Sequence, residues 1–255
     1  MNSLSFVPIT GAVLGVVSFF TSYIVAVARN DVYPWWPYIS DTGTTVPESC
    51  IFGELLSLTA FFALCTMIVR YKWVQVFSKG DRGLNRMNTA SLTIGCLSCF
   101  FMTMVANFQE TSVRLVHMPV SACTFGFGLV YNFFHSEITR KMTPHVSRVS
   151  VWVLRLTLCV TSLIAFGLLY GFGASANQIA DWSKNQSNAR IHWNPEDSGW
   201  KLHLVSTISE WIVGFCVILY FLTYSLEFRN FSLRLEPQLA ETFEHEDNDA
   251  APLMI

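Results

Sequence analysis

A few ionisable side chains fall inside, or just at the ends of, the long apolar runs of this sequence. Such residues are costly in hydrocarbon and are therefore candidates for function. Five of them are predicted to lie near the same side of a membrane: Glu54, Glu110, His117, His203 and Glu210. His203 and Glu210 are seven residues apart in one run and so share a helix face. Together the five could form a polar cavity that binds a lipid headgroup, an ion or a proton.

The same side chains also fit a purely structural role. Each acid could be protonated, or paired with a neighbouring side chain or a loop N–H, and so fasten the polar loops to the helix ends. Helix ends lie at the membrane interface, where a polar group costs less than at the bilayer centre. The sequence leaves both roles open.

Histidines could extend this polar site in two further ways. His117, His192 and His203 could join Glu54 or Glu210 around a metal, since zinc enzymes favour three protein ligands. They lie in three separate parts of the chain, however, and no two show tight ligand spacing. We therefore assign no metal and no cofactor. Because the unperturbed pKa of histidine is about 6.5, the same residues could instead sense an acidic lumen.

The composition indicates segments that never meet water. Of the 255 residues, 52% are hydrophobic and only 13% are charged, against about 25% charged in soluble domains. The net charge of −2 gives no sign of a nucleic-acid partner. About 20 apolar residues cross a bilayer core. We therefore predict an all-α membrane protein, a six-helix transmembrane bundle with spans at about residues 7–28, 51–69, 88–106, 116–134, 151–172 and 203–224.

Basic residues in short loops predict the orientation of this bundle. The loop after the fourth span carries three of them, and the loops after the first and third spans hold one each. The loop after the second span carries five: Arg70, Lys72, Lys79, Arg82 and Arg86. The loops after the second and fourth spans, and with them both termini, are therefore predicted to be cytosolic. Arg155, near the cytosolic end of the fifth span, is expected to extend towards the headgroups.

The luminal side is predicted to carry compact caps over the helix ends. The first cap, residues 30–52, holds prolines, a Trp pair and a Thr-rich turn, and irregular backbone of this kind cannot face lipid. We expect Asp41, Gly43 and Glu48 to hold this cap in place, with Gly43 supplying conformational freedom. A glycosylation sequon at Asn185, in the loop after the fifth span, falls on the same side.

Residues 1–224 are thus predicted to form the transmembrane domain, and residues 225–255 a cytosolic tail. The tail is acidic, with few packing residues, and is expected to be disordered after about residue 236. Near its end, Asp249 precedes the pair Leu253 and Met254 by four residues, which is the form of an acidic dileucine sorting signal. Such a signal would bind sorting adaptors. The other interpretation, an apolar end that nothing reads, stays open.

Several motifs in the same order resemble the Frag/DRAM/Sfk family of six-span proteins. They are PYISDTGT with PESCIFG (residues 37–53), VANFQE (105–110), HWNPED (192–197), and HLVS with EW (203–211). The resemblance covers all six predicted spans and is strongest to the DRAM branch, the damage-regulated autophagy modulators. It implies a lysosomal or endolysosomal membrane protein that promotes autophagy, with links to programmed cell death. It implies no established catalytic residues, so none is assigned.

Two functional hypotheses follow. The first is a non-enzymatic membrane protein that modulates autophagy through contacts with membrane lipids or with autophagy proteins that the sequence does not identify. Its predicted location is the lysosomal or endolysosomal membrane, with the plasma membrane as the alternative. The second is a lipid-modifying enzyme, or a transporter of protons or small solutes, that uses the luminal polar residues.

Overall fold

The structure is a computed structural model that describes residues 4–180, 191–229 and 231. Over these residues it is all-helical, and six helices are long and apolar enough to cross a membrane, so the predicted all-α, six-span membrane protein is confirmed. A short helix, α7, follows α6 and prolongs the last span. The elements are α1 (Phe6–Ala28), η1 (Asp41–Gly43), α2 (Glu48–Phe77), α3 (Arg82–Asn107), α4 (Glu110–Met142), α5 (Val149–Ile179), α6 (Trp200–Leu222) and α7 (Tyr224–Phe228).

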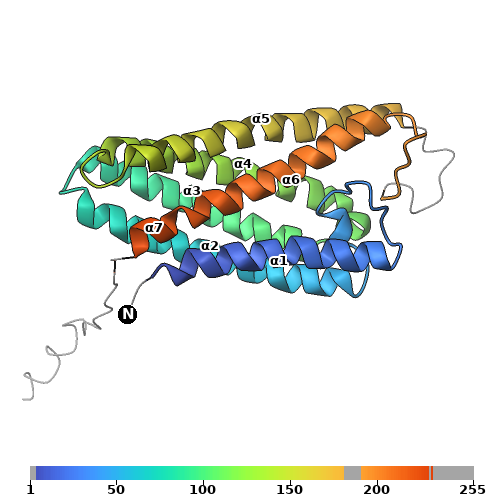
Figure 1. Cartoon of the computed structure of the whole chain (residues 1–255), viewed down its shortest axis with the longest axis horizontal. Helices are drawn as coiled ribbons and strands as arrows, with labels where there is room; N and C mark the ends of the chain where they lie inside the picture. Colours follow the sequence, from blue (N-terminus) through green and yellow to red (C-terminus); the bar gives the residue numbers. More distant parts are fainter. Residues whose placement is uncertain (1–3, 181–190, 230, 232–255) are drawn as a thin grey trace, which may run out of the picture.

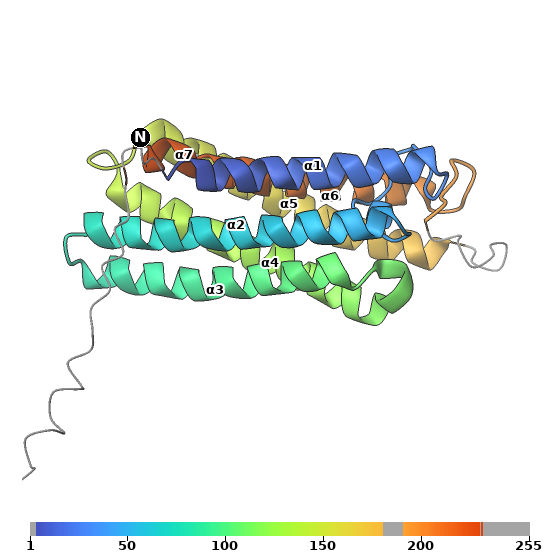
Figure 2. The same ribbon diagram turned by 90° about the horizontal axis from the view of Figure 1, so that it is seen from below.

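The six long helices lie side by side, roughly along one axis (Figures 1 and 2). The most extensive contacts are between consecutive helices, in the pairs α1–α2, α3–α4 and α5–α6. The connections after α1 and α3, and the described residues 191–199 that lead into α6, lie at one end, which we call the cap end. The connections after α2 and α4 lie at the other, the basic end, together with the start of α1 and with α7. The assignment of the basic end to the cytosol stays a prediction.

Small residues allow neighbouring helices to approach closely, as is common in membranes. A Cβ atom placed on Gly11 of α1 would come within 3.1 Å of the Phe62 Cβ of α2. One placed on Gly53 of α2 would come within 2.9 Å of the Ala106 carbonyl oxygen of α3. The backbone of α2 therefore lies against both neighbours with no space for larger side chains at these crossings.

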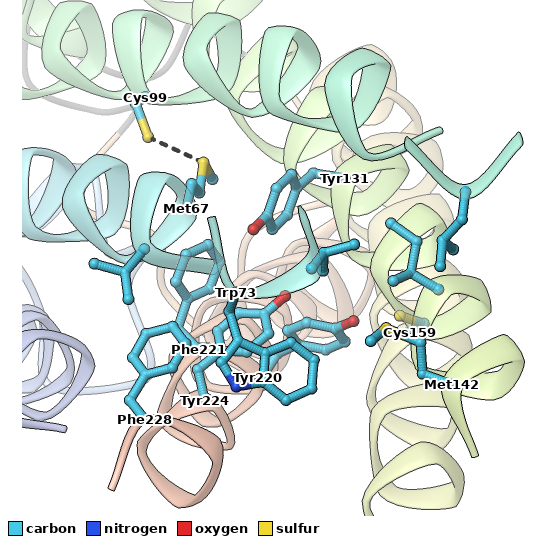
Figure 3. Close-up of a cluster of buried hydrophobic side chains, with 14 residues drawn as sticks. Met67, Trp73, Cys99, Tyr131, Met142, Cys159, Tyr220, Phe221, Tyr224 and Phe228 are labelled. Carbon is cyan, nitrogen blue, oxygen red and sulfur yellow. Dashed lines mark hydrogen bonds between the residues drawn. The ribbon is translucent and has the colours of Figure 1, made fainter. Parts of the chain in front are cut away.

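Six of the fourteen buried side chains in the core of the basic end are aromatic (Figure 3). Tyr220, Tyr224 and Phe228 are each fully buried, on the continuous path of α6 and α7. The rings of Tyr224 and Phe228 stack with centroids 5.9 Å apart. Thus α7, which extends beyond the predicted end of the last span at residue 224, packs as part of the bundle. The tail after residue 231, including the segment expected to be disordered, lies outside the described residues.

Two arginines are buried beside the aromatic residues of this core and share one carboxylate. Arg70 of α2 and Arg155 of α5 are both 0% exposed. The Arg70 Nη1 and Arg155 Nη2 atoms donate to the same Glu227 Oε2, at 2.7 and 2.8 Å. The Arg155 Nη1 atom also donates to Glu227 Oε1 at 3.2 Å. This cluster joins α2, α5 and α7.

Hydroxyl groups and aromatic rings complete the surroundings of these arginines. The Thr139 hydroxyl oxygen of α4 accepts from both guanidinium groups, at 2.8 Å from Arg155 and 3.3 Å from Arg70. The guanidinium carbon of Arg70 lies 4.3 Å from the centroid of Trp73, and that of Arg155 lies 4.4 Å from the centroid of Tyr224. Both predictions for these arginines are therefore wrong: Arg70 is no loop residue, and Arg155 does not extend to the headgroups. Their partner lies too far along the chain for a local pattern to reveal it.

The cluster predicts a large effect of Glu227→Gln on stability. The substitution leaves two buried guanidinium groups without their carboxylate, and breaking a buried ion pair in this way costs about 3–5 kcal/mol. The free energy of unfolding would be measured by titrating the purified protein in mild detergent with sodium dodecyl sulfate. Glu137→Gln is the matched control, since Glu137 pairs with Arg140 on an exposed surface. Equal losses in both variants would contradict the proposed role of the cluster.

Candidate functional site

The connection between α1 and α2, residues 29–47, folds over the cap end of the bundle, and we call it the cap. Its backbone is held by side chains of α6. The Ile39 N–H donates to Glu210 Oε2 at 2.5 Å, and the Trp211 indole N–H donates to the Pro37 carbonyl at 2.9 Å. The Ser40 N–H also bonds to Glu210. Irregular backbone thus keeps its hydrogen bonds where it covers the helix ends.

The turn at η1 is held by α1 and packs closely against α2. The Thr42 and Ser22 hydroxyl groups lie 2.8 Å apart, and the Thr42 hydroxyl also donates to the Ile39 carbonyl at 2.7 Å. Gly43 does not adopt a positive φ, so the expected conformational freedom is not what this position needs. A Cβ atom there would lie 2.5 Å from the Phe52 ring. Glycine is required at this position because of that close contact.

Glu48 links the start of α2 to the end of α1. It is 1% exposed, and its carboxylate lies 3.8 Å from the Arg29 Nε atom. Arg29 in turn contacts Asp31 at 3.2 Å. As an acidic residue in the first turn of α2, Glu48 also interacts favourably with the helix dipole. These contacts tie the two ends of the cap together.

Asp41 and Glu110 form a carboxyl pair beneath the cap. Asp41 is 3% exposed, and its side chain hydrogen-bonds that of Glu110. Burial raises the pKa of Asp41 well above its usual range, and the negative charge of Glu110 raises it further. Because two carboxylates can bond only through a shared proton, Asp41 donates and Glu110 accepts. Glu110 also pairs with Arg114, whose Nη1 atom lies 2.5 Å from Glu110 Oε1.

Beside this pair lies a cavity of about 160 Å³, which we call the polar vestibule. Its wall contains the ion pair of Glu110 and Arg114. Hydroxyl groups contribute as well, and those of Ser121 and Tyr170 lie 3.1 Å apart. The other polar side chains that line it are Tyr38, Ser40, His117, Asn177 and Glu210.

A second cavity of about 130 Å³, the apolar cavity, runs between α1, α2, α3, α4 and α6. Most of its wall consists of aliphatic, aromatic and glycine residues. Four polar residues line both cavities, which therefore adjoin: Ser40, His117, Ser121 and Glu210. The combined space is apolar inside the bundle and polar beneath the cap.

The structure brings together Glu110, His117 and Glu210 of the five candidate residues, since all three line the polar vestibule. Glu54 is exposed on α2 and lines neither cavity. His203 also lies outside both cavities. It is packed between aromatic rings, with centroids 4.3 Å from Trp193 and 5.1 Å from Tyr38.

The remaining candidates lie elsewhere. The His192 Nε2 atom lies 3.2 Å from the Asn30 carbonyl oxygen, at the edge of the cap. Within the described ranges no group of three or more His, Cys, Asp or Glu side chains is arranged to hold a metal ion. The glycosylation candidate, Asn185, and the sorting signal, Asp249, Leu253 and Met254, fall outside the residues that the structure describes.

Comparison with known proteins identifies the family. The model described as the Frag1/DRAM/Sfk1/Cwh43P N-terminal domain matches residues 3–231, which include all six spans. The chain belongs to this family. No solved structure matches it. Within this Frag1/DRAM/Sfk1/Cwh43P domain, the segment from residue 37 to 53, which carries the family resemblance, supplies Tyr38 and Ser40 to the vestibule and Asp41 to the carboxyl pair.

Curated relatives place the chain near one branch of the Frag1/DRAM/Sfk1/Cwh43P family. It is 37% identical over 247 residues to the DNA damage-regulated autophagy modulator protein 2 of Bos taurus, covering 93% of this chain and 89% of the relative. It is 35% identical to modulator protein 1 of Homo sapiens, covering 94% and 97%. It is 29% identical to the modulator of macroautophagy TMEM150B of Danio rerio, covering 71% and 79%.

The sequence analysis did not identify several residues that line the polar vestibule. Arg114 follows Glu110 by four residues on the same helix, a spacing at which opposite charges interact, so this signal was present in the sequence. Tyr170 and Ser121 gave no comparable signal. They face each other from α5 and α4, and neither hydropathy nor spacing predicts which side of an apolar helix faces the bundle interior.

The carboxyl pair predicts a pH dependence of stability that Asp41→Asn reduces. Since folded Asp41 keeps its proton at pH values where the unfolded chain has lost it, the folded state binds more protons and this contribution to stability falls as pH rises. The slope is at most about 1.4 kcal/mol per pH unit for one proton. Asn mimics the protonated acid, because its amide can donate to Glu110. The free energy of unfolding of Asp41→Asn should therefore change less between pH 5 and pH 7.

The control is Asp81→Asn, at the exposed N-cap of α3, where the Asp81 carboxylate accepts the Leu84 N–H at 3.0 Å. Asparagine caps helices about as well as aspartate. This variant should keep the pH dependence of the wild-type protein. A wild-type slope that persists in Asp41→Asn would show that Asp41 does not carry the extra proton.

Proposed function

We propose that this protein modulates autophagy from the lysosomal or endolysosomal membrane, through contacts with lipids or proteins and without catalysis. The names of its relatives support this proposal, since proteins 35–37% identical over more than nine-tenths of the chain are named autophagy modulators. The cap end would face the lumen, where Asn185 would be glycosylated. A link to programmed cell death is part of the same proposal.

The observation that supports lipid contact best is the pairing of the two cavities. Ligand sites are typically concave, mostly apolar and supplied with a few polar groups. The apolar cavity provides the first two properties, and the polar vestibule provides the third. In the vestibule, Glu210 holds the cap backbone, Glu110 holds Arg114, and the Ser121 hydroxyl contacts Tyr170. These arrangements favour binding over the alternative of an enzyme, because each polar group already has a positioning role.

Filling the apolar cavity should impair autophagy modulation. Val217 of α6 lines this cavity, and Val217→Phe would place a ring in it. Autophagic flux would be measured in cells that lack the protein and are then supplied with wild-type or variant chains. Val217→Phe should restore less than half of the wild-type effect. Leu219→Phe is the matched control, since Leu219 is 49% exposed on the same helix and should restore it fully. Equal restoration by both variants would argue against the cavity as the functional site.

The proposed sorting signal in the C-terminal tail predicts where in the cell the protein is found. Leu253→Ala combined with Met254→Ala removes the proposed sorting signal and should move a tagged protein from lysosomes to the plasma membrane. Fluorescence imaging against a lysosomal marker measures the change. Pro252→Ala, in the same tail but outside the pair, should leave the location unchanged. A double variant that remains lysosomal would show that another signal directs the protein.

A further inference from the structure

We propose that the apolar cavity and the polar vestibule together bind a single-chain amphiphile whose head is a protonated amine. This inference deepens the proposed function by naming the chemistry of the lipid, and it rests on that function only in assuming that lipid contact is how the protein acts. It follows from the shape of the cavity, the lack of a basic partner for Glu210 among the described residues and the hydrogen-bonding capacity of the vestibule wall.

The shape fits one extended chain. The wall of the apolar cavity follows α1 from Pro8 to Phe19 and α6 from Glu210 to Phe221. Each stretch covers eleven helical steps, which correspond to about 16 Å at 1.5 Å per residue. A water needs about 10–15 Å³ of such space, so 130 Å³ would hold roughly ten waters. An apolar wall does not bind that many waters well, whereas an alkyl chain fills the space and buries apolar surface.

One carboxyl group of the vestibule has no basic partner in the part of the chain that the structure describes. Glu110 pairs with Arg114, and both residues line the vestibule. Glu210 accepts the Ile39 N–H and forms no ion pair among the described residues. An ammonium group would give the Glu210 carboxyl group an ionic partner. An anionic head would instead lie beside an acid that has no cation next to it, in a poorly hydrated site where like charges are costly.

The wall also offers acceptors where the two cavities meet. The His117 Nδ1 atom lies 2.6 Å from the Phe108 carbonyl oxygen. Since a carbonyl only accepts, Nδ1 carries the hydrogen and Nε2 of the neutral ring is left as an acceptor. His117 is 2% exposed and lines both cavities, as do the Glu210 carboxylate and the Ser121 hydroxyl. An ammonium group has three donors and no acceptor, and therefore complements this set.

The test is competitive binding to the full chain in detergent micelles at pH 7, read by native mass spectrometry. Four probes separate head from tail: hexadecylamine, 1-hexadecanol, palmitate and butylamine. Hexadecylamine should bind at least about tenfold more tightly than each of the others, because a hydrogen bond to a charged group contributes about 1.5–3 kcal/mol. Equal or tighter binding of hexadecanol or palmitate would overturn the cationic head. Equal binding of butylamine would overturn the role of the apolar cavity.

Variants assign the binding to this site. Glu210→Gln keeps an oxygen that can accept the Ile39 N–H but removes the acid that would pair with an ammonium group, and should reduce hexadecylamine binding about tenfold with little effect on hexadecanol. Glu137→Gln removes an exposed carboxylate at the basic end and should change neither. Val217→Phe should weaken both probes, since it fills the apolar part. Hexadecylamine binding that survives both Glu210→Gln and Val217→Phe, in protein that retains its helical circular dichroism, would place the amine elsewhere and overturn the proposal.

Binding and autophagic flux then separate this inference from the proposed function. If autophagic flux depends on the protein but hexadecylamine does not bind selectively, the inference of an amine ligand fails and the proposed function stands. Selective amine binding that Glu210→Gln removes, in a protein whose deletion leaves flux unchanged, would overturn the proposed function alone.

Discussion

The site depends on one constraint, the need of the cap backbone for hydrogen bonds at the edge of a membrane. Ile39 lies in irregular chain that covers the bundle, and its N–H must find an acceptor away from bulk water. Glu210 of α6 supplies that acceptor at 2.5 Å. The same carboxyl group lines both cavities, so the group that holds the cap is also one of the acids of the vestibule. The cap and the candidate ligand site are therefore built on one side chain.

The two ends of the bundle treat buried charge in opposite ways. At the basic end, Arg70 and Arg155 have no exposed surface and share the carboxylate of Glu227. Hydroxyl groups and aromatic rings also contact the two guanidinium groups. Charges that are satisfied in this way join helices. At the cap end, Glu110 and Glu210 face a space that other atoms can enter. This difference in access, more than any difference in residue type, separates the structural cluster from the candidate binding site.

Hydropathy was sufficient to predict the six spans and the helical class, because each span must be apolar along its length. It could not show which face of a span turns inward, and for this reason Glu54, which is exposed, was grouped with Glu210, which is buried. The need for glycine at position 43 arises from contact with the Phe52 ring, which no local rule contains. Of the missed contacts, only the pair of Glu110 and Arg114 had a local spacing that could have revealed it.

The arginine cluster has a consequence for the order in which the chain is assembled. Arg70 is synthesised 157 residues before Glu227, and Arg155 is synthesised 72 residues before it. While the earlier spans are being made, both arginines therefore lack the carboxylate that they share in the folded protein. Only the arrival of the last span supplies their carboxylate. This end of the bundle consequently acquires its ion pairs only after the last span has been made, although two of the three charged residues belong to earlier helices.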